Sequence, residues 1–192
     1  MAQKLAERLG QAVIVYAKAN PNLANYASSS ATFQLATELF KMRTGAPLEH
    51  IPYKCSGKML AAVIGSEVLM ALANPLPVAG HVEAATAGVL AITSSQRATE
   101  YPDMPTMAEA GVPDLEVALW SGLFAPATPP SLIVSRLERE LMETVRLPEV
   151  YERLAALAVQ PNGGSARDLA QRIAAEIPRW AAIAKSANIS LD

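Results

Sequence analysis

The sequence has few residues of the types that usually carry metal binding, disulfide bonds or catalysis. Its 192 residues include one cysteine and two histidines. The single Cys55 cannot form an internal disulfide, and no spacing of cysteine and histidine resembles a zinc site. There is no G-x-S-x-G motif and no serine beside a recognisable base. The sequence therefore predicts neither an enzyme nor a metal or cofactor site.

Charged residues and long apolar runs are also scarce. Charged side chains make up 18% of the chain and the formal net charge is −2, without any cluster of lysine or arginine. This composition argues against nucleic-acid binding. No apolar run approaches the ~18 residues that cross a bilayer. Aromatic residues make up only 5% of the chain, so aliphatic side chains must fill the core.

The N-terminal residues, MAQKLAERLGQ, form an amphipathic segment of mixed charge that does not resemble a signal peptide. We therefore expect either a cytoplasmic protein or one whose export signal has been removed. Apolar side chains recur at helical spacing over residues 2–19, which predicts a helix. A helix that ends at Gly10 and is followed by a short strand is the alternative.

The sequence does contain ample apolar material, arranged as alternating strands and helices. Hydrophobic residues make up 51% of the chain, which argues against disorder. After a stop signal at residues 20–24, the predicted strands cover 25–30, 48–53, 68–73 and 89–95, and the predicted helices cover 31–44, 56–67 and 76–88. This alternation predicts an α/β fold with a parallel sheet covered on both faces. The apolar segments 68–73 and 89–93 fit central strands.

A proline-rich stretch then interrupts the alternation. Residues 101–130 hold six of the fourteen prolines. Within this stretch, Thr106 and Glu109 have the spacing of a capping box at the start of a short helix, which Gly111 should end. Residues 115–126 should then form an extended segment. We interpret the stretch as the crossing of the chain from one lobe to another.

The last third of the sequence is predicted to be helical. Thr128 followed by Pro129 is typical of a helix cap with proline in the first turn. Helices are expected at residues 130–146, at residues 147–157 and at residues 165–188. Pro178 should kink the last of these helices.

Two predicted loops follow the carboxyl ends of strands and are rich in small polar residues. Residues 56–58 present backbone N–H groups at one helix start, and residues 28–32, SSSAT, do the same at another. Ligands of open parallel sheets bind at this edge, so two such loops facing one crevice suit a small carboxylate. The alternative is that these serines are only helix caps. The Gly-Lys pair is not an NTPase loop, because Pro52 and Met59 stand where glycine and Ser/Thr are required.

Several single residues have both a functional and a structural interpretation. Lys54 could pair with an anion, and an ordinary solvated lysine is the alternative. Cys55 is expected to fill a small buried or half-buried site, and His81 to make a structural hydrogen bond. Trp120 and Phe124 are expected to pack the junction between two lobes, with ligand stacking as the alternative.

Several stretches together resemble one family. LANYASSS…LATELFKMRTG, HIPYK, GHVEAATAGVLAITSSQRATEYPDMPTMAEAGV, WSGLFAPATPP and VYERLAALAVQPNGG are similar to the TctC or Bug receptors, the substrate-binding proteins of tripartite tricarboxylate transporters. The resemblance runs from about Asn22 to Leu191, and YPDMPTMAEAG is its most specific part. It implies a periplasmic receptor with a type II periplasmic-binding-protein fold. Two α/β lobes of such a receptor close on a small carboxylate, which is handed to membrane components of the transporter.

The resemblance also implies a domain organisation. Residues 20–115 correspond to the family's second α/β domain, and residues 1–19 and 116–192 to an incomplete, mostly helical first domain. Members begin with a signal peptide, then a strand and a glycine-rich loop that are not found in this sequence, so we expect a truncated receptor. The apolar segment EVALWSGLFAP would lack neighbouring strands, which predicts a homodimer.

The pocket that the resemblance implies departs from the usual family pattern. Cys55 follows PYK where PYKG is usual, and Ala73 precedes Asn74 where FDN is usual. Members tend to have a glycine-rich turn with histidine where this chain has serines. The predicted ligand-binding residues are Ser28, Ser29, Ser30, Thr32, Lys54, Ser56, Gly57 and Asn74. We expect weak or no binding of a small carboxylate, and the alternative is a dimeric scaffold outside transport with a vestigial pocket.

Overall fold

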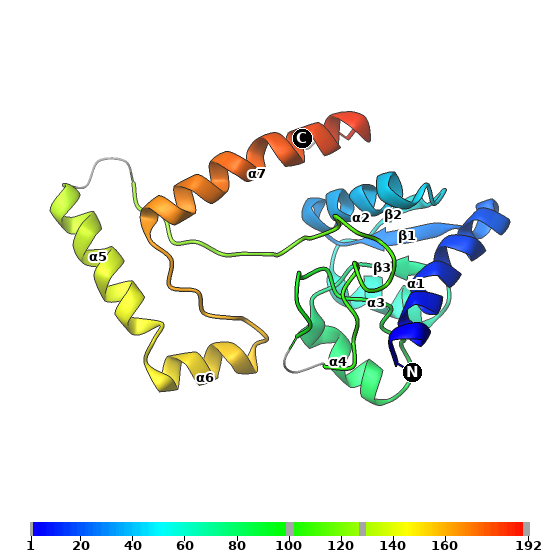
Figure 1. Cartoon of the computed structure of the whole chain (residues 1–192), viewed down its shortest axis with the longest axis horizontal. Helices are drawn as coiled ribbons and strands as arrows, with labels where there is room; N and C mark the ends of the chain where they lie inside the picture. Colours follow the sequence, from blue (N-terminus) through cyan, green and yellow to red (C-terminus); the bar gives the residue numbers. More distant parts are fainter. Residues whose placement is uncertain (1, 99–101, 127–129, 190–192) are drawn as a thin grey trace. The chain divides into compact units, whose positions relative to one another are not determined.

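The computed structural model of the chain describes residues 2–98, 102–126 and 130–189. The chain forms two compact units (Figure 1). Unit 1 comprises Met1–Leu119 and Ile183–Asp192, and unit 2 comprises Trp120–Ala182. Among the helices of the described ranges, none combines the length and hydrophobicity that crossing a bilayer requires.

Unit 1 is built on a three-stranded parallel sheet. β1 (Asn25–Ser28) lies between β2 (Glu49–Pro52) and β3 (Met70–Ala71), which gives the strand order β2-β1-β3. The chain moves from β1 to one side and then crosses back to the other. Right-handed crossovers therefore place α2 (Ala31–Thr44) and α3 (Ser56–Ile64) on opposite faces of the sheet (Figure 1). This confirms the predicted α/β class with a parallel sheet.

Helix α2 has the predicted boundaries because both of its ends carry specific signals. The Ser30 hydroxyl accepts a hydrogen bond from the Phe33 N–H, with 3.4 Å between the two atoms. At the other end, Gly45 adopts a left-handed conformation with φ of 64° and donates its N–H to the Lys41 carbonyl. Leu39 and Phe40 are buried in the core.

The other face of the sheet is covered by α3. Met59 is fully buried, and it clusters with Ala27 of β1, with Leu60 and Ala62 of α3, and with Val68. Ala27 faces this cluster, whereas its neighbours Tyr26 and Ser28 point to the opposite face, as the alternation of a strand requires. The helix ends at Ile64, before the predicted residue 67, because Ser66 adopts a left-handed conformation with φ of 59° and the Glu67 N–H bonds back to the Ala62 carbonyl.

Two predicted central strands were wrong. Of residues 68–73 only Met70–Ala71 pair with the sheet, and they form its edge. Residues 89–95 form no strand, and Ile92 makes an isolated bridge to Thr106. The Ile92 N–H donates to the Pro105 carbonyl, and the Ile92 carbonyl accepts from the Met107 N–H. This segment therefore pairs with the proline-rich stretch and not with the sheet.

The helix before β1 and the helix after β3 can also be compared with their predictions. α1 (Ala2–Ala19) is one continuous helix, so the alternative that ended it at Gly10 is wrong. α4 (Pro75–Glu83) is shorter than predicted, because the chain turns at Ala85, where φ is 54°. The Thr86 and Ala87 N–H groups both bond to the His81 carbonyl. The His81 ring also lies 3.3 Å from the Thr86 hydroxyl, which agrees with its predicted structural role.

The predicted capping box is present, but it closes a turn and not a helix. The Thr106 N–H donates to the Glu109 carboxylate over 2.8 Å, and the Glu109 N–H donates to the Thr106 hydroxyl over 3.2 Å. Arg97 holds the same carboxylate at 2.9 Å, and this ion pair lowers the pKa of Glu109. Gly111 then adopts a φ of 85° and ends the turn. Beyond it, the Val117 N–H donates to the Thr93 carbonyl.

Unit 2 contains helices α5 (Ser131–Thr144) and α6 (Pro148–Ala156) and most of α7 (Ala166–Ser186). Ser165 caps α7, because its hydroxyl accepts the Asp168 N–H over 3.1 Å. The helix continues through Pro178, and the kink predicted there stays a prediction. The predicted cap formed by Thr128 and Pro129 lies outside the described residues.

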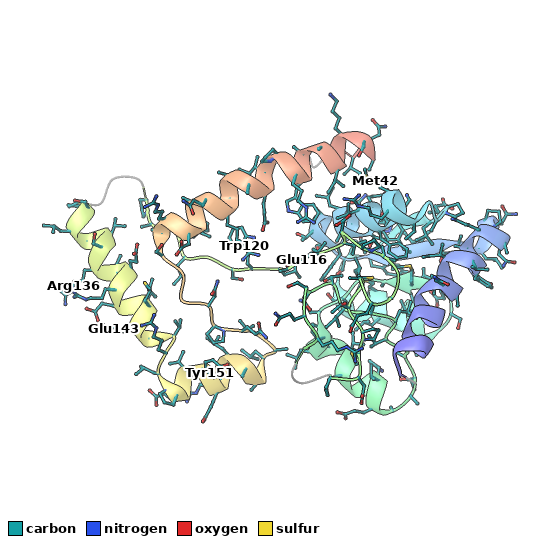
Figure 2. All side chains as sticks on the ribbon, in the orientation of Figure 1. Met42, Glu116, Trp120, Arg136, Glu143 and Tyr151 are labelled. Carbon is teal, nitrogen blue, oxygen red and sulfur yellow. The ribbon has the colours of Figure 1, made fainter. Side chains whose placement is uncertain are left out.

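An indole–carboxylate cluster joins the start of unit 2 to α7. The Trp120 indole N–H donates to Glu176 over 2.9 Å, and Arg172 bonds the same carboxylate over 2.9 Å. Figure 2 labels Trp120 beside α7. Phe124 is 70% exposed, and its packing at a lobe junction stays a prediction.

Candidate functional site

The two polar loops predicted from the sequence meet in the structure. The Ser29 hydroxyl lies 3.1 Å from the Ser56 hydroxyl, although the two residues are 27 positions apart. Ser29 belongs to the serine turn (residues 28–32), which connects β1 to α2. Ser56 belongs to the α3 turn (residues 53–58), which connects β2 to α3. Because α2 and α3 lie on opposite faces, this contact marks the point where open parallel sheets form their ligand crevice.

The chemistry of this meeting point is that of hydrogen-bond donation. The first turns of α2 and α3 both carry backbone N–H groups without partners inside their own helices. Lys54 and Gly57 are exposed in the α3 turn, and a methyl group added at Gly57 would meet no atom within 4 Å. The backbone is therefore open to close approach. Hydroxyls, N–H groups and the Lys54 ammonium together suit an anion.

The remaining predicted site residues lie at the same edge of the sheet with different roles. Ser30 caps α2, which agrees with the alternative that these serines are helix caps. Thr32 is exposed in the first turn of α2. Asn74 follows β3 and precedes α4, where its side chain is exposed and makes no capping bond. Cys55 is exposed in the α3 turn, so the prediction that it fills a buried or half-buried site was wrong.

Ser28 is part of a buried pair that the sequence analysis did not predict. Its hydroxyl lies 2.7 Å from Nε2 of His50 on the neighbouring strand. A serine beside a histidine is also the arrangement of a nucleophile and its base. Here Ser28 is only 4% exposed, so a substrate cannot reach its oxygen. The pair therefore holds the end of β1 in place.

Further contacts hold the His50 ring. Its ring stacks on the Tyr26 ring with 5.0 Å between the centroids. The Tyr26 hydroxyl donates to buried Glu38 over 2.7 Å, and Lys41 bonds the same carboxylate over 2.8 Å. Burial raises the pKa of Tyr26, and the hydrogen bond to Glu38 raises it further. Burial also lowers the pKa of His50, so its ring is neutral at pH 7.

The register between β1 and β2 is the signal that would have found these residues. It pairs Tyr26 with His50, so both side chains lie on the α2 face. Ser28 lies two residues beyond Tyr26 and shares this face. Within the described ranges, no three His, Cys, Asp or Glu side chains are grouped closely enough to hold a metal ion.

Comparisons with known proteins agree with this geometry. The family profile described as "Tripartite tricarboxylate transporter family receptor" matches residues 2–189. Protein BugT of Bordetella pertussis is 36% identical over 94% of this chain and 56% of its own length. A protein encoded in the tcbD-tcbE intergenic region of a Pseudomonas species is 32% identical over 85% of this chain and 50% of its own length. The chain thus spans about half the length of these curated relatives.

Solved structures give the same result for the fold. The structure described as "R. palustris Rpa4515 with adipate" is 34% identical, with a TM-score of 0.80, over 92% of this chain and 60% of that one. A structure described as a periplasmic transporter is 29% identical, with a TM-score of 0.79, over 95% of this chain and 61% of that one. The fold is therefore of the periplasmic-binding-protein type.

Proposed function

The chain belongs to the tripartite tricarboxylate transporter family of receptors, and on that premise we propose that it binds a small carboxylate between the serine turn and the α3 turn. Members of the family are substrate-binding proteins and not enzymes. The observation that carries the proposal is the 3.1 Å approach of the Ser29 and Ser56 hydroxyls, because it brings two donor-rich turns to one point.

The expected binding mode follows from the donors at this point. A carboxylate would accept hydrogen bonds from the Ser29 and Ser56 hydroxyls and from the free N–H groups at the start of α3. The partial positive charge of a helix N-terminus favours an anion there, and Lys54 adds a full charge nearby. Gly57 allows the ligand to approach the backbone. We expect Ser28, Ser30, Thr32 and Asn74 to shape this edge, and we expect weak affinity because the two turns contact one side of the ligand.

The ligand class that we propose is a di- or tricarboxylate. The related protein of R. palustris was solved with adipate, which is a dicarboxylate, and it is 34% identical to this chain. Adipate is therefore the first probe to test. In the working receptor, we propose that the bound carboxylate is delivered in the periplasm to the membrane components of a tripartite transporter.

The test is a binding titration with adipate and with shorter dicarboxylates and tricarboxylates. Ser29→Ala and Ser56→Ala should each weaken binding by roughly 10-fold or more, because a hydrogen bond to a charged group contributes about 1.5–3 kcal/mol. Ser186→Ala is the matched control, since Ser186 contacts Met42 at the far end of α2 from the serine turn. Wild-type affinity in the double variant, or no binding of any carboxylate, would contradict the proposal.

We also propose a domain assignment and an oligomeric state. Residues 20–115 correspond to the second α/β domain of the family, and residues 1–19 and 116–192 to part of the first. A homodimer is supported by the exposed apolar side chains of unit 2, such as Leu132 and Phe124. Size exclusion with light scattering at several concentrations tests the dimer, and a monomer at all of them would refute it. Family membership does not favour the scaffold alternative.

A further inference from the structure

The serine turn begins at a residue that is fixed from outside the turn. Ser28 is the last residue of β1 and is buried, and its hydroxyl lies 2.7 Å from Nε2 of His50. The next residue, Ser29, makes the contact with Ser56. We propose that His50 is a positioning residue that sets, through Ser28, where the serine turn meets the α3 turn. Its consequence for ligand affinity rests on the function proposed above.

The His50 ring itself has little freedom to move. Its backbone is held in the β1–β2 register opposite Tyr26, and its ring stacks on the Tyr26 ring at an interplanar angle of 28°. Tyr26 is fully buried and is anchored by its hydrogen bond to Glu38. The backbone on the other side of Ser28 is closed as well, because the Ser28 carbonyl accepts the Tyr53 N–H over 2.8 Å. Nε2 therefore presents a fixed hydrogen-bonding partner to Ser28.

The tautomer and the protonation state of His50 together decide the direction of this bond. A neutral imidazole with its proton on Nδ1 accepts the Ser28 hydroxyl at Nε2, whereas an imidazolium can only donate there. Protonation of this tautomer would therefore rotate the Ser28 hydroxyl. This rotation would change the conformation of the adjoining Ser29. The groups that face His50 are Tyr26 on β1 and the charged pair of Glu38 and Lys41 on α2.

These neighbours oppose one another in their effect on His50. Burial lowers its pKa most, Glu38 raises it, and Lys41 lowers it again, with a net result below the ordinary value of 6.5. The ring is neutral at pH 7 and becomes charged only as the pH falls below 6.5. If His50 positions the turn, the serine turn should change conformation over that same acidic range.

The first test follows the turn by NMR and needs no ligand. The amide signals of Ser29, Ser30 and Gly57 should titrate between pH 7.5 and 4.5 together with the His50 imidazole signals. The chain has two histidines, so His81→Gln identifies the His50 signals and serves as the control that leaves the turn unchanged. His50→Gln should abolish the titration of the turn. Turn amide signals that do not shift over the pH range of the His50 titration would overturn the proposal.

The second test uses matched variants and adipate as the probe. Gln can place its amide carbonyl oxygen near the position of Nε2 and accept the Ser28 hydroxyl there, whereas Asn is too short to reach Ser28. We expect His50→Asn to weaken adipate binding at least 5-fold at pH 7.5, and His50→Gln to recover most of that loss. Equal affinity of His50→Asn and wild type, with unchanged turn amides, would overturn the proposal.

Two further readouts keep the outcomes separate. Ser28→Ala removes the bond from the other side and should reproduce the turn shifts of His50→Asn, while Ser28→Thr should restore the wild-type signals. The two Ser28 variants decide the proposal even where His50→Asn fails to fold. If wild type binds no adipate or related carboxylate, the proposed function fails, and the ligand-free NMR titration still decides the role of His50.

Discussion

The helices of both units carry apolar side chains, but the two units bury very different amounts of apolar surface. In unit 1, side chains from the sheet, from α2 and α3 and from the proline-rich stretch are buried, and Tyr26 and Met59 are fully inaccessible. Among the described residues of unit 2, none is buried. Helix α7 shows the contrast within one element, because Ile183, where the chain rejoins unit 1, is 5% exposed, whereas Ile177 in unit 2 is 64% exposed. Helical periodicity therefore predicts a helix without predicting its partner.

The apolar side chains of α5 illustrate this lesson. Leu137 and Leu141 lie one turn apart on this helix, yet both remain exposed. On α6, Tyr151 is also exposed, and Figure 2 labels it on the surface. Unit 2 depends correspondingly more on polar contacts. Its main one is the Glu176 carboxylate, which accepts bonds from Trp120, Trp180 and Arg172.

The largest expected effect comes from truncating a core side chain in unit 1. Met59→Ala should lower the free energy of unfolding by about 2–5 kcal/mol, because Met59 is fully buried among aliphatic neighbours. The matched change in unit 2, Leu137→Ala, should cost less than about 1 kcal/mol, because that side chain is half exposed. Urea denaturation followed by circular dichroism measures both. Similar losses in the two variants would show that unit 2 buries this face in solution.

A smaller loss is expected from the buried polar network of unit 1. Tyr26→Phe deletes the hydroxyl that donates to Glu38 and should cost about 1–3 kcal/mol, because a buried carboxylate loses one of its two described partners. Tyr53→Phe is the matched control, since Tyr53 contributes its ring to the core beside α3. Urea denaturation midpoints, compared at a constant m-value, measure the difference in unfolding free energy between the two variants. Equal stability of the two variants would contradict the account of this network.

The parts of the fold that the sequence predicts well are those with local signals. Ser30 and Gly45 bound α2, and Ser165 opens α7, through hydrogen bonds within a few residues. The failures depend on distant partners. Residues 89–95 have the composition of a strand, yet their backbone groups bond to the proline-rich stretch. Nothing in the local pattern of an apolar segment specifies which backbone it will pair with.

One part of the candidate site was also predictable from the sequence and another part was not. The meeting of Ser29 and Ser56 was predictable, because carboxyl ends of neighbouring parallel strands share one edge. The His50–Ser28 pair was not, because it requires the β1–β2 register as well as the strand order. A shift by one residue would have placed His50 on the opposite face. Cys55 was misplaced because a small apolar side chain gives no local signal of exposure.

The indole–carboxylate cluster of unit 2 predicts a pH effect of moderate size. Burial raises the pKa of Glu176, but its bonds to Trp120, Arg172 and Trp180 outweigh burial and lower it below the ordinary value of 4.5. This contribution to stability is therefore complete above pH 4.5 and is lost as the pH falls through the lowered pKa. Glu176→Gln should cost about 1 kcal/mol, at the low end because the group is partly exposed.

Tryptophan fluorescence measures this prediction, because both tryptophans of the chain lie in unit 2. Wild type should change its emission below pH 4.5, and Glu176→Gln should show the acid-like emission at all pH values. Glu140→Gln on α5 is the control, since the ion pairs of Glu140 with Arg136 and Arg139 are exposed. An unchanged emission in Glu176→Gln would show that the cluster is not the main stabilising contact within unit 2.

The smallest expected effect is the loss of one helix cap in unit 2. Ser165→Ala removes the hydroxyl that accepts the Asp168 N–H and should cost about 0.5–1 kcal/mol. Ser131→Ala is the control, because Ser131 is the first residue of α5 and the cap position of that helix is held by Pro130, which makes no side-chain capping bond. Thermal unfolding followed by tryptophan fluorescence compares the two variants. If Ser165→Ala matched its control, local capping would contribute nothing to α7, and the stability of unit 2 would have to come from whatever covers its apolar faces.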